Sequence, residues 1–309
     1  MQNTEPTFKK KSLFRELNLN YEERKEYYKE KRAYNYDNNK DLIGFKMKKA
    51  IHPALLKLIE LQRKIVYNQT LTIIGDKRKV TNKPIIYACT HGGIYDIEIV
   101  MEAIKKHAYM LMGDPETVYR TINGYLSNIN GIIYIDLYDK EDKKIAMLTA
   151  ERLLNQGGSL LMFPEGAWNI TENEAVMKLF PGTVNLALKT GAEIVPIALE
   201  HYGNDYYLNI GENISYDKEQ IDAKELTKDL RDILATLKWS ILENFTEQRG
   251  NLPDNYSEIF IKDRMKDAGD FYNIQRINDA KFKNKNEVNA DEVFAINITE
   301  KPKSRILLK

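Results

Sequence analysis

Residues 85–104 read IIYACTHGGIYDIEIVMEAI, and this stretch decides the fold. Its first five residues, 85–89, are a short apolar run with the character of a buried strand. Gly92 and Gly93 permit a sharp turn, and the apolar residues after Asp96 recur at helical spacing. We therefore predict a strand, a turn and a helix, with His91 and Asp96 at the two ends of the turn.

The same alternation continues on both sides of this stretch. Further strands are predicted at 71–74, 132–135, 159–163 and 194–199, and further helices at 141–155, 183–190 and 225–245. Gly157 and Gly191 stand just after two of these helices, where a residue with positive φ commonly ends a helix. Strands that alternate with helices favour a layered α/β domain.

Residues 42–67 form a separate amphipathic helical pattern, which we expect to bend or restart at Pro53. Its polar side carries one acidic residue, Glu60, and six basic ones: Lys46, Lys48, Lys49, Lys57, Arg63 and Lys64. An apolar face beside basic residues is typical of a helix that docks reversibly on an anionic membrane surface. The alternative is a helix that covers the main domain and holds its lysines in water.

These patterns divide the chain into three parts. Residues 1–40 are a polar, charged N-terminal segment, predicted as a solvated helix that fades into a linker at 37–39. Residues 41–245 are the main domain, which begins with the amphipathic helix. Residues 246–309 are a C-terminal extension whose role the sequence does not indicate.

Composition narrows the class of protein. The chain holds 46 Lys and Arg against 45 Asp and Glu, so its net charge of +1 and its lack of a reader motif argue against nucleic-acid binding. The single cysteine, Cys89, excludes an internal disulfide framework and suits a reducing compartment. No segment has the composition of a signal peptide or a transmembrane helix. We expect a cytoplasmic protein that is peripheral on the inner face of a membrane.

The candidate catalytic base is His91. It follows a predicted strand, and Asp96 lies at the start of the next helix, where a carboxylate could accept a hydrogen bond from one imidazole nitrogen. The other nitrogen would then be free to take a proton. Such a pair also arises by chance, and Cys89 is either a buried strand residue or the nucleophile of a Cys/His pair. The remaining histidines, His52, His107 and His201, are interpreted as surface or capping residues.

Four ordered segments resemble the sequence boxes of the glycerolipid acyltransferases, in particular those of the lysophosphatidate (1-acylglycerol-3-phosphate) O-acyltransferase type. They are residues 91–96 (HGGIYD), 131–136 (GIIYID), 163–166 (FPEG) and 194–197 (IVPI). Each box is modest evidence alone, whereas four in the family's order are strong evidence. Glu165 of the third box, taken alone, is equally explained as an ordinary turn residue or a helix-capping residue.

This resemblance implies a central, mostly parallel sheet flanked by helices, with N-terminal amphipathic helices and a C-terminal extension added. It implies that His91 is the general base for an acceptor hydroxyl, that Asp96 fixes its tautomer, and that the acyl donor is acyl-CoA or acyl carrier protein. Glu165 and Gly166 would hold a lysophospholipid or related acceptor, and Val195 and Pro196 would shape the acyl-donor side. No metal ion or cofactor is implied.

The sequence departs from the family pattern at two positions that usually hold arginine. Leu137 follows the second box, and the third box continues with Ala167, Trp168 and Asn169. Trp168 and Asn169 are predicted to wall the acceptor pocket, with the ring stacking on the acceptor and the amide bonding a hydroxyl. The missing arginines leave the acceptor open and allow an alternative, a catalytically silent lipid- or glycan-binding protein of the same fold.

Overall fold

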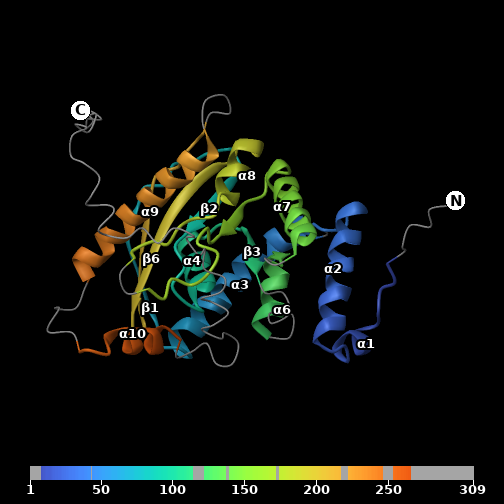
Figure 1. Cartoon of the computed structure of the whole chain (residues 1–309), viewed down its shortest axis with the longest axis horizontal. Helices are drawn as coiled ribbons and strands as arrows, with labels where there is room; N and C mark the ends of the chain where they lie inside the picture. The colour runs from blue at the N-terminus through green and yellow to red at the C-terminus, as the bar shows by residue number, and fades with distance from the viewer. Residues whose placement is uncertain are drawn as a thin grey trace, which may run out of the picture.

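The structure is a computed structural model of the chain, and it describes residues 8–42, 44–113, 122–136, 139–171, 174–216, 222–245 and 253–265. Within these residues seven strands form one sheet in the order β1-β7-β6-β2-β5-β3-β4 (Figure 1). All neighbouring strands are parallel except β6 and β7, which are antiparallel. The strands are β1 (Thr70–Asp76), β2 (Ile85–Cys89), β3 (Tyr109–Gly113), β4 (Ile132–Ile135), β5 (Leu160–Met162), β6 (Glu193–Tyr202) and β7 (Asp205–Ile210).

Helices cover both faces of the sheet. One face packs on α7, α8 and α9 through residues such as Leu153, Val184 and Leu230. The other face packs on α4, through Ile99 and its neighbours, and on α3. The described helices are α1 (Leu13–Leu17), α2 (Tyr21–Asp37), α3 (Phe45–Ile65), α4 (Asp96–Ile104), α6 (Ile122–Asn130), α7 (Lys140–Asn155), α8 (Gly182–Thr190), α9 (Ala223–Phe245) and α10 (Tyr256–Met265).

The predicted α/β architecture with a mostly parallel sheet is therefore confirmed. The five predicted strands and the helices that follow them are present, whereas β3, β7, α6 and α10 were not predicted. A five-residue apolar run such as that of β3 has no period that separates strand from helix, and β7 mixes polar and aromatic residues. The predicted extension 246–309 lies outside the described residues except at 253–265, which contain α10.

The expected restart at Pro53 is wrong, because α3 is one continuous helix of 21 residues. A proline inside a helix removes one backbone hydrogen bond, which leaves the carbonyl four residues earlier without its donor. Pro53 is exposed, as is Lys49 four residues before it. Water can therefore satisfy the carbonyl that the proline leaves without a donor.

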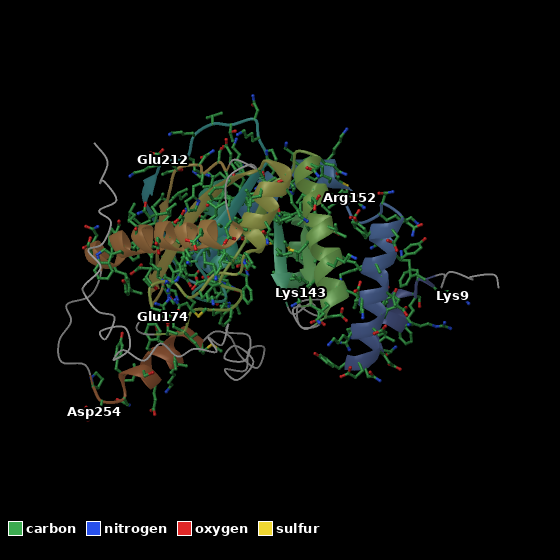
Figure 2. The ribbon with its side chains drawn as sticks, turned by 45° about the horizontal axis from the view of Figure 1, so that its top comes forward. Lys9, Lys143, Arg152, Glu174, Glu212 and Asp254 are labelled. Carbon is green, nitrogen blue, oxygen red and sulfur yellow. The ribbon has the colours of Figure 1, made fainter. Side chains whose placement is uncertain are left out.

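The helix predicted for the N-terminal segment is α2, and it lies against α7 at one end of the sheet rather than being surrounded by solvent (Figure 1). Arg32 of α2 donates from Nε to Oδ1 of Asp142 at 2.6 Å, and the other oxygen of Asp142 accepts from the backbone of Asp136 at 2.7 Å. Arg152 of α7, labelled in Figure 2, donates to Asp41 just beyond α2 at 2.9 Å. These ion pairs therefore attach the N-terminal segment to α7, one of the helices that cover the sheet.

Arg32→Ala is expected to destabilise the protein by about 3 kcal/mol, because it leaves the fully buried carboxylate of Asp142 without its cation. Lys64→Ala is the control: its pair with Glu60 is exposed and contributes less than about 0.5 kcal/mol. Urea denaturation of both variants measures the difference. Equal stabilities for the two variants would contradict the account of α2.

Candidate active site

His91 and Asp96 meet at the carboxyl end of β2. Nδ1 of His91 lies 2.7 Å from Oδ2 of Asp96, and the same oxygen accepts from the backbone N–H groups of Gly92 at 2.6 Å and Gly93 at 2.9 Å. Asp96 is fully buried and is the first residue of α4. The predicted turn therefore forms, and one carboxylate oxygen holds it closed.

These contacts determine which nitrogen of His91 carries the proton. Because two N–H groups already donate to Oδ2 of Asp96, the carboxylate is an acceptor, and Nδ1 of the imidazole is the third donor. Nε2 then carries a lone pair in the neutral ring. The side chain of His91 keeps 17% of its surface exposed, so the ring is accessible from solvent.

Glu165 lies behind the His91 turn. Its Oε1 accepts from the backbone N–H of His91 at 2.9 Å, and its Oε2 accepts from that of Met177 at 2.8 Å. The side chain is 1% exposed, and burial raises the pKa of its carboxyl. The sequence predicted that Glu165 contacts an acceptor, whereas its contacts in the structure are with the backbone that carries the base.

Gly166 allows the third box to turn sharply. Its φ of +71° is in the left-handed region, and a Cβ atom at this position would lie 2.5 Å from the ring of Phe180. Phe180 is itself held by its backbone N–H, which donates to the carbonyl of Pro164 at 2.8 Å. A side chain at 166 would therefore be strained and would displace that ring.

Aromatic rings flank His91 on two sides. Phe163 stacks on the imidazole with ring centroids 4.1 Å apart, and Trp168 presents its ring nearly perpendicular to it at 6.1 Å. Trp168 is therefore next to the candidate base, and only 4% of it is exposed. Packing on both sides restricts the imidazole to the orientation that Asp96 selects.

Asn169 is attached to the same loop through its backbone, which donates to the carbonyl of His91 at 2.7 Å. Its side-chain amide is occupied by its own loop: Nδ2 donates to the carbonyl of Glu174 at 2.8 Å, and Oδ1 accepts from Thr171. Glu174 is labelled in Figure 2. The predicted hydrogen bond from this amide to an acceptor hydroxyl would require the loop to open.

Val195 and Pro196 are buried in β6, next to β2, where they pair with Tyr87 and Ala88. Val195 belongs to the core beneath α4, so its predicted place on the acyl-donor side is not an exposed one in this structure. Cys89 is likewise fully buried, and burial raises the pKa of its thiol well above its usual value. The structure therefore favours a packing role for Cys89 over a nucleophilic one.

Comparison with known proteins shows what this part of the chain is similar to. Residues 70–200 match the sequence model of the family named Acyltransferase. They contain His91, Asp96, the third box and most of the sheet. The match covers less than half of the chain. The predicted resemblance to glycerolipid acyltransferases is thus confirmed.

Two curated relatives are named 1-acyl-sn-glycerol-3-phosphate acyltransferase. The protein of Chlamydomonas reinhardtii is 26% identical over 130 residues, which are 42% of this chain and 38% of the relative. That of Borreliella burgdorferi is 30% identical over 82 residues, which are 26% of this chain and 32% of the relative. The match therefore covers about a third of the length of each relative.

A solved structure has the same fold. It is that of the 1-acyl-sn-glycerophosphate (LPA) acyltransferase PlsC of Thermotoga maritima, with a TM-score of 0.54 and 15% sequence identity. The match covers 65% of this chain and 84% of the other. At 15% identity this match shows a similarity of fold alone.

Residues that follow the family-matched segment 70–200 in the chain also contact the candidate site. Glu200 of β6 is buried and bound by two cations: Nζ of Lys238 in α9 at 3.3 Å and the guanidinium of Arg264 in α10. Arg264 also lies near the His91 turn, since a Cβ atom on Gly92 would be 3.3 Å from it. Figure 1 shows α10 across the end of the sheet where β6 finishes. No local sequence signal joins these three residues, which come from three separate elements.

Two of the histidines interpreted as surface or capping residues are in fact buried. His201 is 8% exposed and stacks on Tyr206, with ring centroids 5.0 Å apart, and burial lowers the pKa of its imidazole. His52 is 4% exposed and bonds to Asn130. Leu137, the other site of a missing arginine, lies outside the described residues. Among the described residues no group of three or more His, Cys, Asp or Glu side chains is placed to hold a metal ion.

Glu200→Gln is expected to destabilise the protein by about 3 kcal/mol at pH 7 and by much less near pH 2. Lys238 and Arg264 lower the pKa of the Glu200 carboxyl from 4.5 to about 2. Because the pKa of Glu200 is lower in the folded protein than in the unfolded chain, its ionised carboxylate stabilises the fold at pH values above about 4.5. That stability is lost as the pH falls from about 4.5 towards 2.

Urea denaturation at a series of pH values measures this effect. The control is Glu212→Gln, which changes an exposed carboxylate, labelled in Figure 2, whose lysine partner is also exposed. A loss of stability in Glu200→Gln that does not depend on pH would contradict the charge-based explanation.

Proposed function

We propose that this protein is an O-acyltransferase that moves a fatty acyl group from a thioester to a hydroxyl group of a lysophospholipid. The observation that carries the proposal is the 2.7 Å contact between Nδ1 of His91 and Asp96, which leaves Nε2 of a partly exposed imidazole as a base. The names of the curated relatives and the match of residues 70–200 to the acyltransferase family support it.

The reaction begins with removal of a proton from the acceptor hydroxyl by Nε2 of His91. The oxygen attacks the thioester carbonyl and forms a tetrahedral intermediate, whose collapse forms the ester bond and breaks the carbon–sulfur bond. The thiolate of coenzyme A or of acyl carrier protein leaves and takes the proton back from the imidazolium. A thioester is already activated, so neither a covalent enzyme intermediate nor a cofactor is required.

The surrounding residues favour the transient imidazolium and keep it in place. Asp96 is a buried carboxylate in contact with the ring nitrogen remote from the substrate, so it stabilises the positive charge that forms there. Glu165 positions the backbone of His91, and Phe163 supports the ring. Trp168, where the family usually has arginine, is beside the imidazole, so an aromatic ring stands next to the base in place of a cation.

His91→Ala is expected to lower kcat by at least about 10² to 10⁴, because it removes the base. Asp96→Asn should lower kcat severely but less, because the imidazole remains while its preferred tautomer is lost. Release of free thiol from acyl-CoA, with and without a panel of lysophospholipids, measures both variants. Thermal unfolding of His91→Ala checks that the variant is folded.

The outcome also separates the proposal from its alternative, a silent binding protein. Wild-type turnover that His91→Ala retains would refute the mechanism. Lipid binding by the wild type without any thiol release would favour the silent protein.

We further propose that α3 docks the protein on the inner face of a membrane. Its outward side carries a row of exposed apolar residues at helical spacing: Met47, Leu58, Leu61 and Ile65. Exposed lysines flank this row at 46, 49, 57 and 64. Two of the six predicted basic residues do not contribute, since Arg63 is buried against Glu102 and Lys48 is half-buried against the carbonyl of Asn128. None of the described helices is long and apolar enough to cross a bilayer.

Changing Lys46, Lys49 and Lys57 to Glu is expected to weaken binding to anionic vesicles by about a hundredfold, since each surface cation contributes about 1 kcal/mol. The matched control changes Lys140, Lys143 and Lys144 of α7 to Glu, three exposed lysines on another surface (Figure 2 labels Lys143). Vesicle flotation at low and high salt measures binding. Binding that neither salt nor the α3 substitutions alter would contradict the docking proposal.

A further inference from the structure

A cavity of about 50 Å³ lies between α3, α4 and α6, on the face of the sheet that α3 and α4 cover. Most of its wall is apolar: Leu55 and Ile59 come from α3, Ile97 and Met101 from α4, and Met110 from β3. The volume is a few times the roughly 10–15 Å³ of accessible space that one water molecule needs. The cavity can therefore hold part of an organic ligand.

Two polar atoms in this apolar wall have no hydrogen-bond partner among the described residues. They are Nε2 of His52 and Oε2 of Glu98, and both are buried. A buried polar atom without a partner costs about 1–3 kcal/mol. Each side chain also lines the cavity. The pair therefore marks a place where a ligand with a polar group would gain hydrogen bonds.

The hydrogen bonds of Asn130 determine what His52 can offer. Nδ2 of Asn130 donates to the carbonyl of Ala108 at 3.0 Å, so its Oδ1 is the atom 2.7 Å from Nδ1 of His52. The imidazole must donate from Nδ1 to that oxygen. Nε2, which has no partner among the described residues, is then an acceptor in the neutral ring and needs a donor from the ligand.

The carboxyl group of Glu98 requires the opposite of His52, namely a hydrogen-bond acceptor on the ligand. Burial raises the pKa of its carboxyl to about 7, so at neutral pH a large fraction of the molecules carry the proton and can donate it in a hydrogen bond. A hydroxyl group donates one hydrogen bond and accepts others, so it has both the donor that His52 requires and the acceptor that Glu98 requires. Water can do the same, but it has no apolar part to fill the remaining wall.

The position of the cavity indicates an aliphatic ligand. Leu58 lines the cavity and is also one of the exposed apolar residues of α3. Apolar surface therefore continues from the outside of the helix into the wall. Ile97 and Glu98 follow Asp96 directly on α4, so the cavity begins within one helical turn of the residue that orients His91.

We propose that this cavity binds an aliphatic chain that carries a hydroxyl group, with the hydroxyl between His52 and Glu98. The chain is the acyl group of the thioester donor, an assignment that rests on the proposed function. The protein therefore prefers hydroxylated acyl chains to unsubstituted chains of equal length.

Calorimetric titration of the full chain with free fatty acids tests binding apart from catalysis. Hydroxy fatty acids with the hydroxyl at successive carbons are compared with the unsubstituted acid of the same length. For at least one hydroxyl position we expect binding about tenfold tighter than for the unsubstituted acid. The corresponding acyl-CoA thioesters should show the same preference in kcat/KM.

Three variants test the named contacts. Glu98→Met removes the polar partner and should abolish the preference, whereas Glu98→Gln keeps a donor and an acceptor and should retain most of it. His52→Phe should also abolish it. Glu212→Met replaces an exposed carboxylate far from the cavity and should bind like the wild type.

The outcomes separate this inference from the proposed function. Equal affinity for hydroxylated and plain chains, no binding of either, or a preference that survives in folded Glu98→Met would overturn the inference. A binding preference without transfer from any thioester would support the cavity's ligand and refute the acyltransferase proposal.

Discussion

One carboxylate oxygen, Oδ2 of Asp96, is the contact on which the candidate site depends. It accepts from two glycine N–H groups and from His91, so a single buried atom closes the turn, satisfies the backbone and selects the imidazole tautomer. Without it the two N–H groups would be buried without partners at the start of α4, which costs about 1–3 kcal/mol each. The spacing of five residues between His91 and Asp96 follows from this geometry, because the chain must turn back on itself for both the ring and the backbone to reach one oxygen.

Burial of that carboxylate has a consequence for the rest of the chain. Asp96, Glu165 and Glu200 are three buried carboxyl groups around one loop, and buried negative charges are costly unless cations accompany them. The family-matched residues 70–200 contribute all three carboxyl groups, whereas Lys238 and Arg264, the two cations that lower the pKa of Glu200, come from α9 and α10. Residues 70–200 alone therefore lack the two cations that stabilise the buried carboxylate of Glu200. The segments that follow them in the chain are part of the site's support.

The sequence was informative wherever a signal is local. A strand, two glycines and a helix are readable in residues 85–104, and β2 and β4 begin and end as predicted. The contacts that the sequence could not predict join distant residues, as Glu200 does with Lys238 and Arg264. Glu165 illustrates the same limit within a recognised motif: the pattern locates the residue, but only the fold reveals that the backbone of Met177 and His91 occupies its two oxygens. His52 was misassigned because a histidine among lysines has the composition of a surface, whereas its own side of α3 faces Asn130.

The helix α3 has features of both interpretations that its sequence left open. Its inner side packs on the domain through groups such as Arg63, which forms two bonds to Glu102, and its outer side keeps an apolar row flanked by lysines. A helix that only covers a domain has no need of exposed Leu61 and Ile65, because water favours polar residues there. A helix that only docks on lipid has no need of a buried ion pair such as that of Arg63 with Glu102. The two sets of residues on one helix therefore support the proposal that α3 packs on the domain with one side and docks on an apolar surface with the other.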